Sequence, residues 1–101
     1  MVNLHFAIYS KTGTLMFGPV ANNTLWSGFG GSCQAFNSGD PVVLHDQLAD
    51  RWIFTQFTGG APFRNCFAIS TTSDPLGTYF RYEIPVPSNV LPDYPKWGIW
   101  P

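Results

Sequence analysis

Glycine and proline punctuate this chain at short intervals, and this spacing constrains its fold more than any other feature. Ten glycines and nine prolines occur among 101 residues, and short runs rich in β-branched and aromatic side chains lie between them. No stretch of ten or more residues combines helical apolar spacing with a cap. The pattern therefore predicts an all-β domain. Its expected strands cover residues 4–10, 15–20, 42–46, 51–57, 66–72 and 78–84, with a further candidate at 96–100.

The order of these runs predicts a single small domain with four parts. Residues 1–20 form a hairpin whose turn contains Gly13, a residue free to adopt positive φ. Residues 21–39 are a Gly-rich loop, and residues 40–84 hold four successive strands joined by short turns. Residues 85–101 are a tail with most of the prolines and several aromatic residues. Successive strands with short connections predict an antiparallel meander.

The apolar pattern of two strands indicates where they lie in the sheet. Residues 42–46, VVLHD, are almost continuously apolar, which is typical of a strand covered on both faces, so we expect a central or innermost position. Residues 78–84, TYFRYEI, alternate, with Tyr79, Arg81 and Glu83 on one face and apolar side chains on the other. This alternation favours an outer or edge strand.

Charged residues gather at the predicted turn that follows VVLHD, in the sequence DQLADRW. An arginine can hold a carboxylate through two parallel hydrogen bonds. We therefore expect Arg51 to pair with Asp46 or Asp50 and to lock the bend. The next residue, Trp52, lies inside a predicted strand and is expected in the core.

Charged side chains make up only 11% of the chain, against 45% hydrophobic and 17% aromatic. Globular domains carry about 25% charged residues, so little charge keeps apolar surfaces apart here, and self-association is expected. The net charge of −1 offers no basic field for nucleic acid. No apolar run reaches the ~20 residues that cross a bilayer, and the first residues do not form a signal peptide. The localisation stays open.

The two cysteines, Cys33 and Cys66, are 33 positions apart and belong to no CxxC motif. A zinc site needs more ligands at close spacing, and His5 and His45 lie apart from the cysteines and from each other. Two states stay open, a single disulfide and two half-buried thiols, because distance in the fold decides between them. We expect no metal and no cofactor.

Catalytic motifs are missing from the sequence. There is no GxSxG elbow, P-loop, GxGxxG or HExxH pattern, and neither histidine has an evident serine or cysteine partner. We therefore expect no catalytic residue, and a non-enzymatic role is favoured.

Four stretches, GPVANNTLWSGFGG, GDPVVLHDQLADRW, STTSDPLGTYFRY and DYPKWGIWP, resemble a block within large secreted bacterial proteins. Those proteins have a β-propeller region similar to the propellers of sialidases and glycoside hydrolases. The resemblance implies a propeller-blade-like fold of about one and a half blades, with a small β-sandwich or barrel completed between subunits as the alternative. The exposed strand edges of such a fragment imply a homo-oligomer.

The resemblance also implies a place for a carbohydrate. Asp40 and Asp93 stand at matching positions, 53 residues apart, and in propeller glycosidases an acid at the start of an inner strand can face the central cleft. Arg64 and Trp97 would line the same cleft. The competing interpretation is that Asp40, next to a proline, stabilises a turn.

The favoured function is a non-catalytic module that self-assembles or binds a partner. The aromatic residues near the C-terminus, Tyr94, Trp97 and Trp100, are candidates for its binding or subunit-contact surface. The first alternative is a carbohydrate-binding or glycoside-hydrolase-related fragment, with Asp40 and Asp93 at its cleft. The second is a folded piece without a function of its own.

Overall fold

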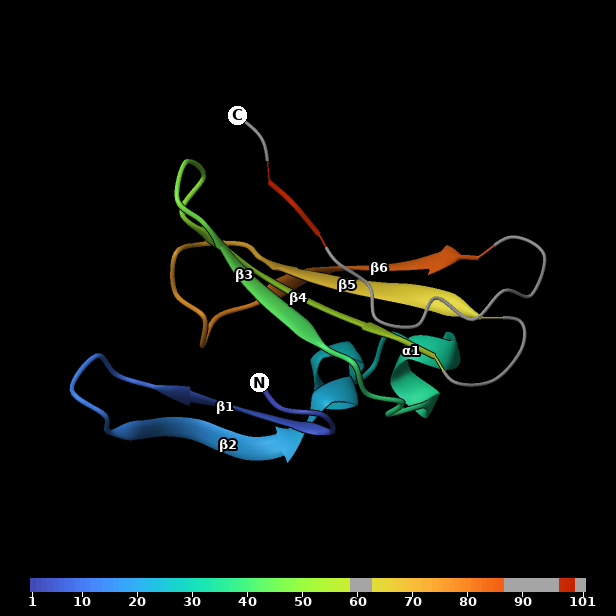
Figure 1. The fold of residues 1–101 in the computed structure, drawn as a ribbon, viewed down its shortest axis with the longest axis horizontal. Helices are drawn as coiled ribbons and strands as arrows, with labels where there is room; N and C mark the ends of the chain where they lie inside the picture. The colour runs from blue at the N-terminus through green and yellow to red at the C-terminus, as the bar shows by residue number, and fades with distance from the viewer. Residues whose placement is uncertain (59–62, 87–96, 100–101) are drawn as a thin grey trace.

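A computed structural model of the chain describes residues 1–58, 63–86 and 97–99. These residues form two antiparallel sheets, one of two strands and one of four, with two short helices between the sheets in chain order (Figure 1). The four strands lie side by side in chain order, which confirms the predicted all-β antiparallel meander. In the described part of the chain neither sheet closes into a barrel, and no helix is long and apolar enough to cross a membrane.

The six strands begin and end within two residues of their predicted bounds. They are β1 (His5–Tyr9), β2 (Leu15–Ala21), β3 (Val42–Asp46), β4 (Arg51–Phe57), β5 (Arg64–Ser70) and β6 (Tyr79–Pro85). The segment predicted as a Gly-rich loop contains the 3₁₀ helix η1 (Asn22–Trp26) and the helix α1 (Gly31–Ala35). Each helix has five residues, which is too short for an apolar period to show in the sequence. The candidate strand at 96–100 is described only at residues 97–99, which have no regular secondary structure.

The hairpin of β1 and β2 depends on two glycines. Gly13 adopts φ 89° in the turn, and its N–H donates to the carbonyl of Ser10 at 2.9 Å. Gly18 adopts φ 83° in β2, and a Cβ atom there would lie 2.7 Å from the carbonyl oxygen of Phe6. The close approach of the two strands at Gly18 therefore requires a residue without a side chain.

Alternation gives the sheet of β3 to β6 two different faces. The inner face looks toward the hairpin and the helices, and the outer face looks away from them. Inner-face side chains include Trp52, Phe54, Cys66, Ala68 and Tyr79. Outer-face side chains include Ile53, Phe67, Ile69, Phe80, Tyr82 and Ile84. The core lies between the inner face, the helices and the hairpin residue Phe6.

The expectation that residues 42–46 are covered on both faces is wrong. β3 is an edge strand that pairs only with β4. Its inner-face residues are exposed, with Val43 at 37%. The reason is that Val43 borders a hollow between the hairpin and the sheet instead of packing in the core. β6 forms the opposite edge, in agreement with the predicted edge position of residues 78–84.

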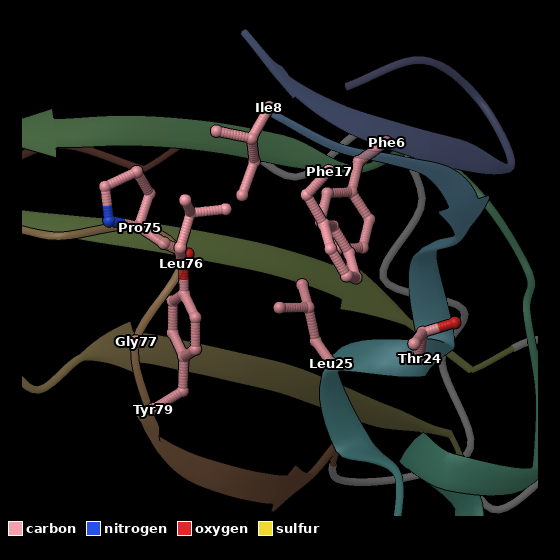
Figure 2. Close-up of a pocket in the computed structure, with 9 residues that line it drawn as sticks. All are labelled: Phe6, Ile8, Phe17, Thr24, Leu25, Pro75, Leu76, Gly77 and Tyr79. Carbon is pink, nitrogen blue, oxygen red and sulfur yellow. The ribbon is translucent and has the colours of Figure 1, made fainter. Parts of the chain in front are cut away.

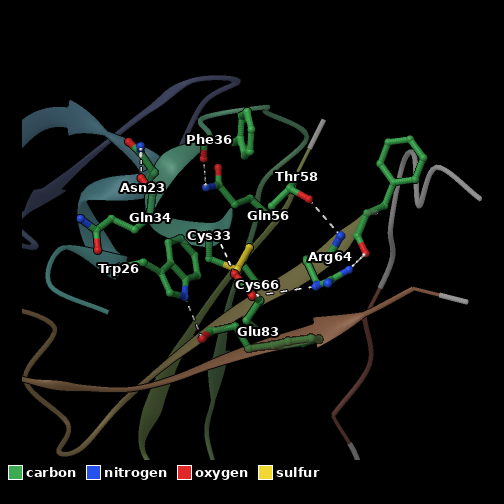
Figure 3. Close-up of a disulfide and its surroundings, with 12 residues drawn as sticks. Asn23, Trp26, Cys33, Gln34, Phe36, Gln56, Thr58, Arg64, Cys66 and Glu83 are labelled. Atoms are coloured by element: carbon green, nitrogen blue, oxygen red, sulfur yellow. Dashed lines mark hydrogen bonds and ion pairs between the residues drawn. A yellow bond between two sulfur atoms is a disulfide. The ribbon is translucent and has the colours of Figure 1, made fainter. Parts of the chain in front are cut away.

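A disulfide joins Cys33 of α1 to Cys66 of β5, which is one of the two states that the sequence left open (Figure 3). Both cysteines are fully buried beside Trp26. The indole Nε1 of Trp26 donates to the carbonyl of Phe67 at 3.3 Å, and the N–H of Cys33 donates to Oε1 of Glu83 at 2.7 Å. These contacts fix both helices on the inner face at one end of the sheet.

Candidate functional site

An apolar cleft lies between the hairpin and the inner face of the four-stranded sheet (Figure 2). It holds two hollows of about 170 Å³ each, and both border Ile8 and Pro75. The first hollow is also lined by Phe6, Phe17, Thr24, Leu25, Leu76, Gly77 and Tyr79, and the second by Met1, Ala7, Tyr9, Val43, Trp52 and Phe54. The walls therefore come from the hairpin, η1, the sheet and the loop between β5 and β6.

A row of aromatic rings crosses the floor of this cleft and holds the hairpin on the sheet. The ring centroid of Phe6 lies 5.9 Å from that of Phe17 and 5.6 Å from that of Phe54. Phe54 in turn makes an edge contact with Tyr79 at 5.7 Å. Aromatic pairs at these separations are attractive, so the row sets the spacing between the two walls.

The mouth of the cleft carries its charged groups. A third hollow, of about 350 Å³, also borders Ile8 and Pro75 and is lined by Lys11, His45, Asp50 and Asp74. Nε2 of His45 lies 3.0 Å from Oδ1 of Asp50. The imidazole also packs against Trp52, with 4.7 Å between ring centroids. Apolar walls and a few convergent polar groups are typical of small-molecule sites.

Tyr79 connects the floor of the cleft to its mouth. Its hydroxyl donates to the carbonyl of Pro75 at 2.6 Å. Burial, together with the nearby carboxylate of Asp74, raises the pKa of Tyr79 from 10.0 to about 12. The phenol is therefore neutral at physiological pH, and it acts as a hydrogen-bond donor that holds the loop in place.

A second candidate surface is the exposed edge of the sheet at β6. Phe80, Tyr82 and Ile84 project from the outer face and are 57%, 49% and 47% exposed. β6 pairs with β5 on one side only, and no described strand covers its other side. An unpaired edge with an apolar face is a typical site of strand pairing between chains.

The charged residues of β6 lie on the inner face and are held by their own chain. Nη1 of Arg81 donates to the carbonyl of Ser27 at 2.6 Å, and its guanidinium lies 5.6 Å from the ring centroid of Phe29. Glu83 accepts the N–H of Cys33. The outer side of this edge therefore carries no charge from β6.

Trp97, one of the predicted contact residues, packs against the outer face of the sheet. Its ring makes an edge contact with Phe67, at 4.9 Å between centroids. Its indole Nε1 is buried and has no hydrogen-bond partner among the described residues. Trp97 therefore covers part of the outer face of the sheet. Asp93, Tyr94 and Trp100, the other predicted residues of the tail, lie outside the described residues.

Asp40 and Arg64, the remaining predicted ligand residues, each make contacts within the chain. Asp40 lies two residues before β3, with φ 44°, and its N–H donates to Oδ1 of Asn3 at 3.2 Å. Nε of Arg64 lies 3.9 Å from Oε2 of Glu83, and its Nη1 donates to the carbonyl of Phe63 (Figure 3). The Arg64 guanidinium is thus engaged within the chain.

The turn between β3 and β4 is held by its polar residues, although not by the expected ion pair. Oδ1 of Asp46 accepts the N–H groups of Leu48 and Ala49 at 3.0 and 3.1 Å. The Arg51 guanidinium donates to the carbonyls of Ala49 and Asp50 instead of to a carboxylate. Asp50 adopts φ 53° and contacts His45. Trp52 is half-buried against the core, close to its predicted position.

No family model, curated protein or solved structure matches this chain. Among the described residues, no group of three or more His, Cys, Asp or Glu side chains is placed to hold a metal ion. Sequence reasoning missed the cleft, because Lys11 lies in the turn between β1 and β2, His45 in β3 and Asp74 in the loop between β5 and β6, and no motif links them. The apolar row on β6 was visible in the sequence as alternation.

Proposed function

We propose that the protein is a non-catalytic β module that self-assembles through the edge strand β6. The observation that supports this role is the exposed apolar row of Phe80, Tyr82 and Ile84 on an unpaired edge. Free N–H and C=O groups on such an edge form hydrogen bonds with a second strand. With only 11% charged residues, the chain has little electrostatic repulsion to oppose this association.

The proposed contact is antiparallel pairing of β6 with β6 of a second copy around a two-fold axis. Such a contact is isologous, since the same residues face each other from both copies. The two four-stranded sheets then become one continuous sheet, and the apolar rows join on its outer face. Arg81 and Glu83 keep their internal contacts, so pairing leaves neither charge without a partner.

We also propose that the module is derived from a propeller blade. The support for this origin is the four-stranded antiparallel meander in chain order, which is the architecture of a blade. The carbohydrate-binding alternative stays a prediction, because Asp93 lies outside the described residues.

Light scattering of the purified chain, coupled to size exclusion, tests the assembly. We expect a dimer at micromolar concentration, and we expect Tyr82→Lys to convert it to a monomer, because the new charge lies on the pairing edge. The matched control is Leu48→Lys, which places the same charge on an exposed turn residue away from β6 and should leave the dimer intact. A monomeric wild-type protein, or a dimer of unchanged stability in the Tyr82→Lys variant, would contradict the proposal.

A further inference from the structure

The cleft between hairpin and sheet has the size of a small-molecule site. Each apolar hollow, at about 170 Å³, is slightly larger than the ~150 Å³ cavity that accepts a benzene molecule in other proteins. One aromatic ring therefore fits in each. The mouth adds about 350 Å³ of partly polar space that reaches solvent. The three hollows meet at Ile8 and Pro75, so a single ligand can occupy a hollow and the mouth together.

The charged groups at the mouth indicate which charge a bound ligand would carry there. Two carboxylates, Asp50 and Asp74, and one ammonium group, Lys11, line the mouth. The imidazole of His45 contacts Asp50, and Oδ1 of Asp74 accepts the N–H of Leu76. Acidic groups therefore outnumber the permanent cation. Trp52 lines the same space, and the face of an indole ring attracts cations. This mouth is complementary to a positively charged group.

We propose that the cleft binds a small amphipathic amine. The aromatic or branched apolar part of the ligand fills a hollow beside Ile8 and Pro75. Its ammonium group lies at the mouth, where the carboxylates of Asp50 and Asp74 accept its hydrogen bonds. This site lies on the inner face of the sheet and does not rest on the assembly proposed for β6.

The test compares three probes of nearly equal size that differ in charge: 2-phenylethylamine, 2-phenylethanol and 3-phenylpropanoate. Each is titrated into the ¹⁵N-labelled full chain and followed by NMR chemical shifts. We expect the amine to bind at least about 10-fold more tightly than the carboxylate, because a charge-assisted hydrogen bond replaces a repulsive contact. The shifted amides should belong to residues around Ile8, Trp52 and Pro75.

Three variants separate this site from unspecific binding. The double variant Asp50→Asn, Asp74→Asn should bind the amine about 10-fold more weakly than the wild type does, and it should bind phenylethanol with unchanged affinity. Asn keeps a side-chain oxygen at both turns and tolerates the positive φ of Asp50. The control Asp46→Asn changes a carboxylate that lies outside the mouth and should bind like the wild type.

The third variant, Leu76→Trp, adds bulk to an exposed residue that lines both the first hollow and the mouth, and it should weaken the binding of all three probes. The NMR spectrum of each variant without probe establishes that it is folded. Equal affinity for the three probes, no binding by any of them, or shifts that map away from the cleft would each overturn the proposal.

Discussion

Loss of the disulfide should destabilise the whole domain, because it joins the helical segment to the sheet within the core. Cys33 and Cys66 are 33 residues apart and are both fully buried beside Trp26. Cross-linking limits the conformations of the unfolded chain. For a loop of this length the chain-entropy relation gives about 4 kcal/mol at 25 °C. A domain of this size has a total stability of about 5–15 kcal/mol, so the loss is a large fraction of the whole.

Urea unfolding with and without a phosphine reductant measures this contribution. The fluorescence of the tryptophans reports the transition, since Trp26 leaves a fully buried position on unfolding. With a slope of about 2 kcal/mol per M for a small domain, a loss of about 4 kcal/mol lowers the midpoint by about 2 M. The double variant Cys33→Ala, Cys66→Ala should show a similar midpoint in the absence of reductant.

Two results decide whether this reasoning holds. Mass spectrometry after alkylation must show two free thiols in the reduced sample, and the reductant must leave the double variant unchanged. If the reduced protein then keeps the midpoint of the oxidised one, the cross-link contributes nothing. The stability would in that case come from the packing of the sheet, the helices and the hairpin without the cross-link.

Two further predictions concern the walls of the cleft. The pKa of Tyr79 is raised from its ordinary value of 10.0 to about 12 in the folded protein. Folding therefore favours the neutral phenol. The contribution of this group to the stability of the fold is fully present below pH 10 and is lost as the pH rises through 12. In Tyr79→Phe, the decline of the urea midpoint over that range should be smaller than in the wild type, and an equal decline would exclude Tyr79 as its cause. Gly18→Ala should destabilise the protein by at least about 1 kcal/mol more than Gly13→Ala, because both residues have positive φ but only Gly18 would also clash with a carbonyl. Thermal unfolding of both variants checks this, and equal costs would contradict the close approach.

The positions of the strands were predictable from the sequence because local patterns specify them. β3 and β4 have the predicted bounds, since β-branched and aromatic runs end at polar turns on both sides. The short helices were not predictable in this way. η1 and α1 are held by tertiary contacts, such as the disulfide of Cys33 and the hydrogen bond of Trp26 to β5, and a pattern of five residues carries none of that information.

The candidate sites depended on partners that are distant in the sequence. Arg51 has Asp46 and Asp50 nearby in the chain, yet it donates to backbone carbonyls, because the Asp46 carboxylate already accepts two N–H groups of the same turn. The carboxylate of Asp50 meets His45 across the turn instead. Sequence proximity therefore indicated the residues of this turn but not their pairing.

The alternation in β6 shows how one pattern can hide the orientation of a strand. In a solitary domain the polar side of an edge strand is normally the one in contact with water. Here Arg81 and Glu83 point inward, where Ser27 and Cys33 satisfy them, and the apolar side faces outward. This inversion leaves the monomer with an apolar edge and few charges to keep it in solution. The proposed pairing through the outer row would cover this apolar edge and would leave the cleft on the inner face open, so the two proposed sites are physically compatible in one assembly.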